Sequence, residues 1–219
     1  YLVFHSFLPA MFLGAIISAF AAPLVYLIAG EIFSEKTAFI AGILTAIEPL
    51  GLFLGVSILT EGIFTPVLFL FTLCFIKYLK ESDSSYLWYS AALLAAATLI
   101  RPVMFYFWLL VIPFIVYKTK NLEWRQVLKM ASLFIVIFFL ILSPWLIRNK
   151  VVIGDWQIAG LQGIVFFVNH YGAVLQYLGQ IGPQSDAYDK AAAIVGPDRV
   201  LTPQGSNELF NAALNGIKN

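Results

Sequence analysis

Six apolar segments constrain the fold of this 219-residue chain more than any other feature. They cover residues 7–30, 37–59, 61–79, 86–100, 102–117 and 127–147. A helix needs about 20 apolar residues to cross the hydrocarbon core of a bilayer, and the first, second, third and sixth segments meet that length. Hydrophobic residues make up 61% of the chain and charged residues 11%, against roughly 45–50% and about 25% in soluble domains. The sequence therefore predicts an all-α polytopic membrane protein.

The fourth and fifth segments are short and meet at Arg101-Pro102. Proline lacks an N–H group and moves the preceding residue out of the α conformation. We therefore expect two short helices joined by a turn, and about six transmembrane helices in all. A second proline, in Glu48-Pro49, predicts a break inside the second segment that leaves residues 50–58 as an interfacial stretch.

Lysine and arginine residues are unequally distributed between the two ends of the predicted spans. The linkers near residues 31–36, 77–83 and 118–129 contain Lys36, Lys77, Lys80, Lys118, Lys120, Arg125 and Lys129. The opposite ends contain Arg101, Arg148 and Lys150. Because positive charges favour the cytoplasmic side, the first group is predicted to be cytoplasmic. The non-cytoplasmic face is then expected to carry Tyr1, Glu61, Arg101, Arg148 and the tail from Asn149.

The composition changes after Arg148, where Gly, Pro, Gln, Asn and Asp become common. The chain is thus predicted to consist of a transmembrane helical region, residues 1–148, and an external, partly helical juxtamembrane segment, residues 149–219. Ile158–Leu178 is only moderately apolar and contains several glycines. We interpret it as a stretch that lies along the membrane surface.

Two short helices are expected near the end of the chain, over Asp186–Val195 and Ser206–Ile217. Ser206-Asn207-Glu208 has the composition of a helix start, because a serine side chain can accept a hydrogen bond from the first free N–H groups. This pattern predicts that Ser206 caps the second of these helices.

Three charged residues, Glu61, Arg101 and Arg148, end long apolar runs and are expected on one membrane face. Ionisable groups beside hydrocarbon are candidates for function because their placement is costly. Glu61 suits a water-facing position at a helix start, or a hydrogen bond to a substrate or to Arg101. The two arginines suit either interfacial anchoring or bidentate recognition of a phosphate.

Two further polar residues are binding candidates on the same predicted face, Asn149 directly after Arg148 and His170 in Asn169-His170-Tyr171-Gly172. His170 also suits a hydrogen-bonded interfacial position. The sequence contains no Gly-rich phosphate loop, no Ser-His-Asp pattern and no zinc-ligand spacing, and Cys74 is its one cysteine. No metal site or cofactor is predicted, although dependence on a divalent metal stays open. No basic patch indicates nucleic acid.

Several short motifs follow one another in a recognisable order. They are Ala29-Gly30-Glu31-Ile32-Phe33, Leu59-Thr60-Glu61-Gly62, Leu99-Ile100-Arg101-Pro102 and Pro144-Trp145-Leu146-Ile147-Arg148-Asn149. Together they resemble the GT-C class of membrane glycosyltransferases, in the branch of dolichyl-phosphate-mannose protein mannosyltransferases and lipid A aminoarabinose transferases. The resemblance covers nearly the whole chain. It departs from the family pattern at three positions. Gly62 stands in place of a proline, Ile100 stands in place of a threonine, and Glu48 precedes Pro49 where the family has no carboxylate.

The resemblance implies a glycosyltransferase that moves a sugar from a polyprenyl-phosphate-linked donor to a protein, lipid or glycan acceptor. The reaction is expected on the non-cytoplasmic face of an inner or plasma membrane, or of the endoplasmic reticulum membrane in a eukaryote. The family's catalytic acidic residue corresponds to a position upstream of Tyr1, so we expect this chain to be a piece of a longer protein without that residue. A transporter or flippase, and a non-catalytic membrane subunit, are the alternatives.

Overall fold

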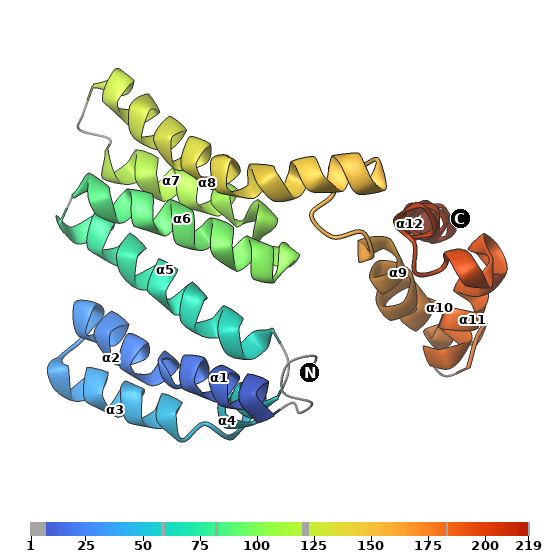
Figure 1. Cartoon of the computed structure of the whole chain (residues 1–219), viewed down its shortest axis with the longest axis horizontal. Helices are drawn as coiled ribbons and strands as arrows, with labels where there is room; N and C mark the ends of the chain where they lie inside the picture. The colour runs from blue at the N-terminus through green and yellow to red at the C-terminus, as the bar shows by residue number, and fades with distance from the viewer. Residues whose placement is uncertain (1–7, 58–59, 82, 120–122, 183, 219) are drawn as a thin grey trace. The chain divides into compact units, whose positions relative to one another are not determined.

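A computed structural model describes residues 8–57, 60–81, 83–119, 123–182 and 184–218. Within these ranges all regular elements are helices, and no strand is present. The chain divides into two compact units, residues 1–144 and 145–219. The division falls inside one long helix, α8 (Trp124–Ile153), and the boundary predicted after residue 148 lies in the same helix (Figure 1).

The first unit is a set of helices joined by short connections (Figure 1). The helix α5 packs against α6 and α2, the helix α2 packs against α3, and α1 contacts both α4 and α5. The elements before α8 are α1 (Leu8–Ala19), α2 (Ala21–Ile32), α3 (Glu35–Ala46), α4 (Pro49–Val56), α5 (Glu61–Glu81), α6 (Ser84–Ile100), the 3₁₀ helix η1 (Pro102–Tyr106) and α7 (Phe107–Lys118).

Three helical stretches are long and apolar enough to cross a membrane: Leu8–Ile32, Glu61–Glu81 and Trp124–Ile153. A fourth is obtained if α3 and α4, which are bent by 52° at their junction, count as one span. The shorter apolar stretches, Ser84–Ile100 and Pro102–Lys118, do not reach that length. The all-helical membrane protein is confirmed, as is the break at Arg101-Pro102, whereas the count of six spans is not shown.

The surface of the first unit is apolar, as a bilayer requires. Phe12, Phe39 and Phe53 have 67%, 61% and 63% of their surface exposed. The interior of the unit combines large buried side chains such as Phe134 and Phe138 with mostly small ones on α6, which contributes Leu87, Ser90, Ala91, Leu94, Ala95, Ala97 and Thr98. Small residues let helices approach closely where lipid supplies no hydrophobic driving force between them.

The break between α3 and α4 is held by Glu48, whose role the sequence did not explain. Its backbone is extended, its Oε1 accepts from the Leu50 N–H at 3.0 Å, and its Oε2 accepts from the Gly51 N–H. Pro49 takes the first helical position, where the missing N–H costs nothing. The carboxylate therefore satisfies the free N–H groups that begin α4, and the predicted break at Glu48-Pro49 is confirmed.

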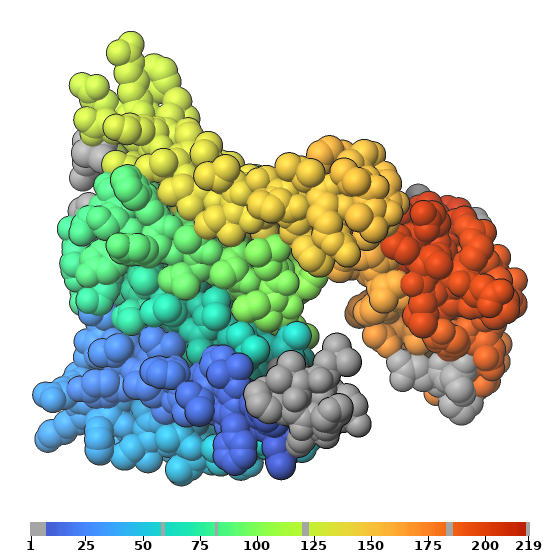
Figure 2. All heavy atoms as spheres, in the orientation of Figure 1, coloured from blue at the N-terminus to red at the C-terminus, as the bar shows by residue number. Residues whose placement is uncertain are grey.

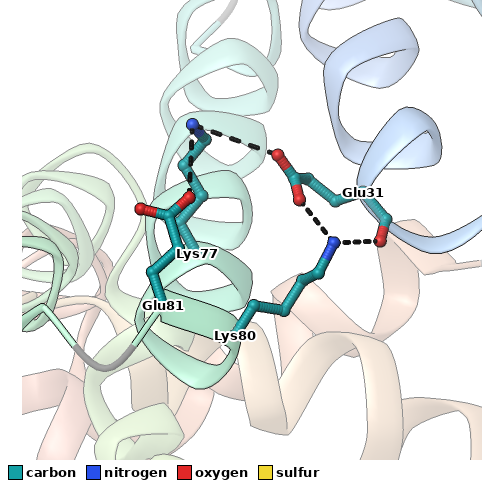
Figure 3. Close-up of polar contacts among 4 residues, drawn as sticks. All are labelled: Glu31, Lys77, Lys80 and Glu81. Atoms are coloured by element: carbon teal, nitrogen blue, oxygen red, sulfur yellow. Dashed lines mark hydrogen bonds and ion pairs between the residues drawn. The ribbon is translucent and has the colours of Figure 1, made fainter.

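A cluster of four charged residues joins the last turns of α2 and α5 (Figure 3). Lys80 Nζ donates to Glu31 Oε2 and to the Glu31 carbonyl oxygen, both at 2.8 Å. Lys77 Nζ lies 3.9 Å from Glu31 Oε1 and 3.9 Å from Glu81 Oε1. Lys80 thus satisfies one of the carbonyl groups that a helix end leaves without a partner, and the cluster fixes the two helix ends to each other.

The second unit follows the end of α8. Its first helix is continuous through α9 (Gln162–Phe166), the π-helical turn η2 (Phe167–Tyr171) and α10 (Gly172–Tyr177). It is followed by α11 (Gln184–Val195), the 3₁₀ turn η3 (Pro197–Arg199) and α12 (Pro203–Lys218). These elements enclose an apolar core made of Ile164, Phe167, Ala191, Val195, Val200, Leu209 and Ala213. The two helices predicted near the end of the chain are confirmed.

The π turn keeps one side of the first helix directed at this core. Phe167 and Gly172 are five residues apart and both buried. In a regular α-helix a spacing of five residues would rotate the second position by about 140° from the first. The wider turn absorbs one residue, so Gly172 lies against Ala187 of α11.

The predicted cap at Ser206 is wrong. The helix α12 begins at Pro203, and the Thr202 Oγ1 accepts from the Gly205 N–H at 3.1 Å. Threonine before a proline at the first helical position supplies the start signal. Ser206 is instead buried, and its Oγ accepts from the N–H groups of Gly163 at 2.8 Å and Ile164 at 3.2 Å. It caps the start of α9 from a distant part of the chain.

We expect Gly163→Ala to destabilise the second unit by about 1–3 kcal/mol or more, the usual range for overpacking. A Cβ at Gly163 would lie 1.8 Å from the carbonyl oxygen of Ser206, which is backbone and cannot turn away. Thermal unfolding of the purified chain, followed by tryptophan fluorescence, measures the effect. The neighbouring exposed position supplies the control, Gln162→Ala. Equal unfolding temperatures for the two variants would contradict the close approach of α9 and α12.

Candidate functional site

A cavity of about 430 Å³ opens in the first unit where five segments meet. The segments are α1, the start of α2, the end of α3, α4 and the start of α5. The volume lies at the lower end of the roughly 300–1,000 Å³ that ligand pockets occupy. Its lining residues are Ala15, Ser18, Ala19, Ala21, Ala22, Thr45, Ala46, Glu48, Gly51, Leu52, Leu54, Gly55, Val56, Glu61, Gly62, Thr65 and Phe69.

Small side chains on α1 and α2 make the room for this cavity. Ala15, Ser18, Ala19 and Ala22 all line it, with the spacing of one helix face. The backbone of α4 lies close to α1 at the cavity wall, since a Cβ at Gly55 would lie 2.7 Å from the side-chain Oγ of Ser18 and a Cβ at Gly14 would lie 3.1 Å from the Gly55 carbonyl oxygen. The small-residue spacing is a signal in the sequence that could have indicated the cavity.

Glu61 begins α5 and lies in the cavity wall. A helix start favours a negative charge because the free N–H groups carry partial positive charge. Its Oε1 accepts a hydrogen bond of 2.9 Å from Arg101 NH1. Of the roles foreseen for Glu61, the structure shows the pairing with Arg101.

Arg101 lies at the break between α6 and η1. Its backbone is extended, with φ −136° and ψ 108°, as the following proline requires. The guanidinium group lies 5.6 Å from the centre of the Phe64 ring, within the range of a cation–π contact. Glu61 and Phe64, both on α5, therefore fix the direction of this side chain.

The Glu61–Arg101 ion pair is partly exposed, with 28% and 40% of the two side-chain surfaces accessible. A pair of this kind contributes at most about 1 kcal/mol to stability in water. Its larger effect is geometric, because it holds one carboxylate at the cavity wall. Glu48 adds a second carboxylate to the same wall, so the cavity combines apolar walls with two strong hydrogen-bond acceptors.

Arg148 and Asn149 belong to the second unit and form a different arrangement. Arg148 NH1 donates to Asn149 Oδ1 at 2.9 Å, and the guanidinium group lies 4.9 Å from the centre of the Trp145 ring. Within the described part of the chain no carboxylate pairs with Arg148. The side chain is exposed, so its remaining N–H groups are open to a ligand.

Asn149 is the buried support of Arg148. Only 1% of Asn149 is exposed, and its Nδ2 donates to the Gln157 carbonyl oxygen at 2.7 Å. This bond turns Oδ1 toward Arg148. The Asn149 amide is thus engaged by Arg148 and by the Gln157 carbonyl group, so Asn149 acts as a buried support for the Arg148 side chain.

His170 lies on the π turn of the second unit and is exposed. Its ring centre lies 5.4 Å from that of Phe166, which in turn contacts Phe210 at 5.1 Å. The three rings form an aromatic cluster across η2, α9 and α12. Among the residues that the structure describes, no hydrogen bond joins His170 to Arg148 or Asn149.

The structure therefore brings the predicted site residues together in three groups. Glu61 pairs with Arg101, Asn149 supports Arg148, and His170 joins an aromatic cluster. Over the described ranges no three His, Cys, Asp or Glu residues lie close enough to hold a metal ion. The location of the three groups on one membrane face stays a prediction.

Comparison with known protein families identifies a model that covers most of the chain. Residues 1–147 match the family model described as dolichyl-phosphate-mannose-protein mannosyltransferase. The matched region contains Glu48, Glu61, Arg101 and the cavity, and it ends directly before Arg148. Searches of curated proteins and of solved structures found no significant match.

We expect Asn149→Ala to lower the stability of the chain by about 1–3 kcal/mol, the cost of leaving buried hydrogen-bonding groups without partners. The substitution removes the acceptor of Arg148 and the donor to Gln157. Thermal unfolding monitored by tryptophan fluorescence measures the change. Asn211→Ala on α12 is the matched control because that asparagine is exposed. A loss of the same size in both variants would argue against the supporting role of Asn149.

Proposed function

The chain belongs to the dolichyl-phosphate-mannose-protein mannosyltransferase family, and from this premise we propose that it transfers a sugar from a polyprenyl-phosphate-linked donor. The acceptor is a protein, lipid or glycan, and the reaction takes place on the non-cytoplasmic face of the membrane. An integral membrane protein of this family acts as a glycosyltransferase on lipid-linked donors. The six-span arrangement predicted from the sequence is part of the same proposal.

The observation that carries the proposal is the Glu61–Arg101 pair at the wall of a ligand-sized cavity, within the region that matches the family. Carboxylates accept hydrogen bonds from sugar hydroxyl groups, and each carboxylate oxygen can accept more than one. Both Glu48 oxygens and Glu61 Oε1 already accept from protein N–H groups, so a sugar would use Glu61 Oε2 and the remaining lone pairs of the other three. The apolar remainder of the wall suits the nonpolar face of a sugar ring. We therefore assign the cavity to the transferred sugar.

The donor phosphate requires a cation, because negative charge develops on it as the bond between the sugar and the phosphate breaks. Arg148, which belongs to the second unit, has the features of such a cation, since it is exposed, supported by Asn149 and without a carboxylate partner among the described residues, and it is proposed for this role independently of the cavity in the first unit. Arg101 is a second candidate, although one of its N–H groups is engaged by Glu61. Asn149 positions Arg148, and His170 offers an aromatic cluster to the acceptor.

The transfer itself forms a bond from an acceptor oxygen or nitrogen to the anomeric carbon and breaks the bond from that carbon to the phosphate oxygen. The acceptor proton passes to a general base. By the family resemblance this base is a carboxylate at a position upstream of Tyr1, and Glu48 and Glu61 are assigned to binding. No cofactor is part of this scheme.

A transporter or flippase is the second candidate, and the bent pair α3–α4 favours it. Transporters place charged residues at breaks in membrane helices, and Glu48 lies at such a break with a bend of 52°. Sugar transfer to an acceptor, measured with a labelled lipid-linked donor and with protein that includes the residues upstream of Tyr1, distinguishes the two. Movement of the donor across vesicles without transfer would favour the alternative.

We expect Arg148→Ala to weaken binding of a polyprenyl-phosphate-linked sugar by about tenfold or more. Hydrogen bonds to charged groups contribute about 1.5–3 kcal/mol, and about 1.4 kcal/mol corresponds to a factor of ten. Arg101→Ala is expected to lower the affinity less. Arg199→Ala is the control, because Arg199 is exposed and paired with Glu208. Undiminished affinity in both Arg101→Ala and Arg148→Ala would rule out phosphate binding by these arginines.

In protein that includes the residues upstream of Tyr1, we expect Ala15→Leu to reduce sugar transfer while the protein stays folded, because the larger side chain occupies part of the cavity. Initial rates at several donor concentrations measure the loss. The control is Ala10→Leu, on the same helix but exposed and outside the cavity lining. Equal rates for the two variants would remove the cavity from the proposed sugar site.

A further inference from the structure

The second unit contains a long stretch without charge. Residues 156–185 include no Asp, Glu, Lys or Arg, whereas a water-exposed segment of that length in an average protein would contain about seven. The stretch covers the whole helix formed by α9, η2 and α10. Its composition is therefore unlike that of a helix surrounded by water.

Large apolar side chains cover the outward side of this helix. We define the α9–α10 face as the five exposed residues Leu161 (41%), Val165 (52%), Val174 (44%), Tyr177 (90%) and Leu178 (58%). The other side of the helix is satisfied by the core of the unit, where Ile164, Phe167 and Leu175 are buried. The exposed apolar residues therefore do not belong to the core of the unit.

The charges of the second unit lie on other elements. Arg148 and Lys150 lie on the end of α8, and Asp155 lies just before the uncharged stretch. The others are carried by α11, η3 and α12, at Asp186, Asp189, Lys190, Asp198, Arg199, Glu208 and Lys218. Figure 2 shows side chains of α11 and α12 over one face of this unit. The unit therefore has a charged part and an uncharged apolar helix, the division expected of a body that contacts both water and lipid.

Hydrogen bonds within the unit return the chain toward the apolar part of α8. Trp145 Nε1 donates to the Ile158 carbonyl oxygen at 2.9 Å, and Asn149 Nδ2 donates to the Gln157 carbonyl oxygen at 2.7 Å. These bonds place residues 157–158 beside Trp145, eight residues before α8 ends at Ile153. Leu161 follows only three residues later, so it lies within about 11 Å of Ile158.

The helix α8 is a candidate membrane span, and its 30 residues extend about 45 Å against a hydrocarbon core of about 30 Å. A helix longer than the core tilts within it or projects beyond it. Tryptophan prefers the headgroup region of the bilayer, and Trp145 begins the last third of α8. The return of the chain to Trp145 thus brings the start of the uncharged helix to the depth of the lipid headgroups.

We propose that the α9–α10 face lies on the surface of the bilayer that α8 crosses, with Leu161, Val165, Val174 and Leu178 in contact with lipid. The partner is the phospholipid surface itself. An interfacial helix of this kind buries its apolar side about 5–10 Å into the boundary between headgroups and acyl chains. Tyr177 then lies at the headgroup level, where tyrosine is favoured.

A fluorescent label on single cysteines tests the proposal in the whole chain reconstituted into phosphatidylcholine and phosphatidylglycerol vesicles. Cys74→Ala first removes the native thiol. Val165→Cys and Leu178→Cys then place an environment-sensitive label on the α9–α10 face, and Asp189→Cys places it on exposed α11 as the matched control. Nitroxide-bearing lipid and aqueous iodide serve as the two quenchers.

We expect the labels at Val165 and Leu178 to emit at shorter wavelength and to be quenched several-fold more by nitroxide lipid than the label at Asp189. Iodide should show the reverse order. Quenching by iodide equal to that at Asp189 would place the face in water and overturn the proposal. Quenching by neither agent would show that protein covers the face, which also overturns it.

A measurement on the unsubstituted chain guards against misfolding of the labelled variants. Hydroxyl-radical oxidation of Tyr177, which is 90% exposed, is compared with that of Tyr188 on α11, which is 40% exposed. In lipid nanodiscs we expect Tyr177 to be oxidised less than Tyr188, despite its greater exposure in the protein alone. Faster oxidation of Tyr177 would contradict contact with the bilayer.

Discussion

In a chain with so few polar side chains, the unpaired backbone groups at helix ends need hydrogen-bond partners. The rest of the structure depends on which side chains supply them. Each helix start leaves N–H groups without internal acceptors, and each helix end leaves carbonyl groups without donors. Water cannot supply the partners inside a bilayer. The Glu48 carboxylate supplies them at the start of α4, and the Ser206 hydroxyl supplies them at the start of α9. Lys80 donates to the Glu31 carbonyl oxygen in the last turn of α2. These polar side chains resemble ligand contacts, but their hydrogen bonds stabilise the fold.

Hydrogen-bond partners also distinguish Arg101 from Arg148, two arginines for which the sequence predicted the same roles. Arg101 contacts a carboxylate and an aromatic ring, so much of its positive charge is compensated within the protein. Arg148 contacts a neutral amide and an aromatic ring, so no carboxylate compensates its positive charge within the described residues. A neutral support fixes direction without reducing the attraction for an anion. This difference, rather than position along the chain, is the reason why we propose Arg148 ahead of Arg101 as the ligand of the donor phosphate.

The sequence predicted well where one residue dictates local backbone geometry. The breaks at Glu48-Pro49 and Arg101-Pro102 were expected, since proline restricts the residue before it, and both are present. The prediction failed at Ser206, because a serine before a helix-like run resembles a cap whether its hydroxyl turns to its own helix or to another. The Glu61–Arg101 pair was one of several possibilities, since forty positions separate the two residues. The cavity was not foreseen, although the small residues on α1 and α2 were visible.

The sequence by itself determined that this is an integral membrane protein made of helices, that its helices break at two prolines, and that its motifs resemble one glycosyltransferase family. These properties follow from composition, from proline geometry and from motif order, all of which are local or additive along the chain. Only the tertiary structure decided that Glu61 engages Arg101, that Asn149 is buried behind Arg148, and that one helix of the second unit keeps an uncharged apolar side exposed. Such facts depend on which side chains meet across distant segments, and hydrogen-bond direction and burial are settled only when the helices pack.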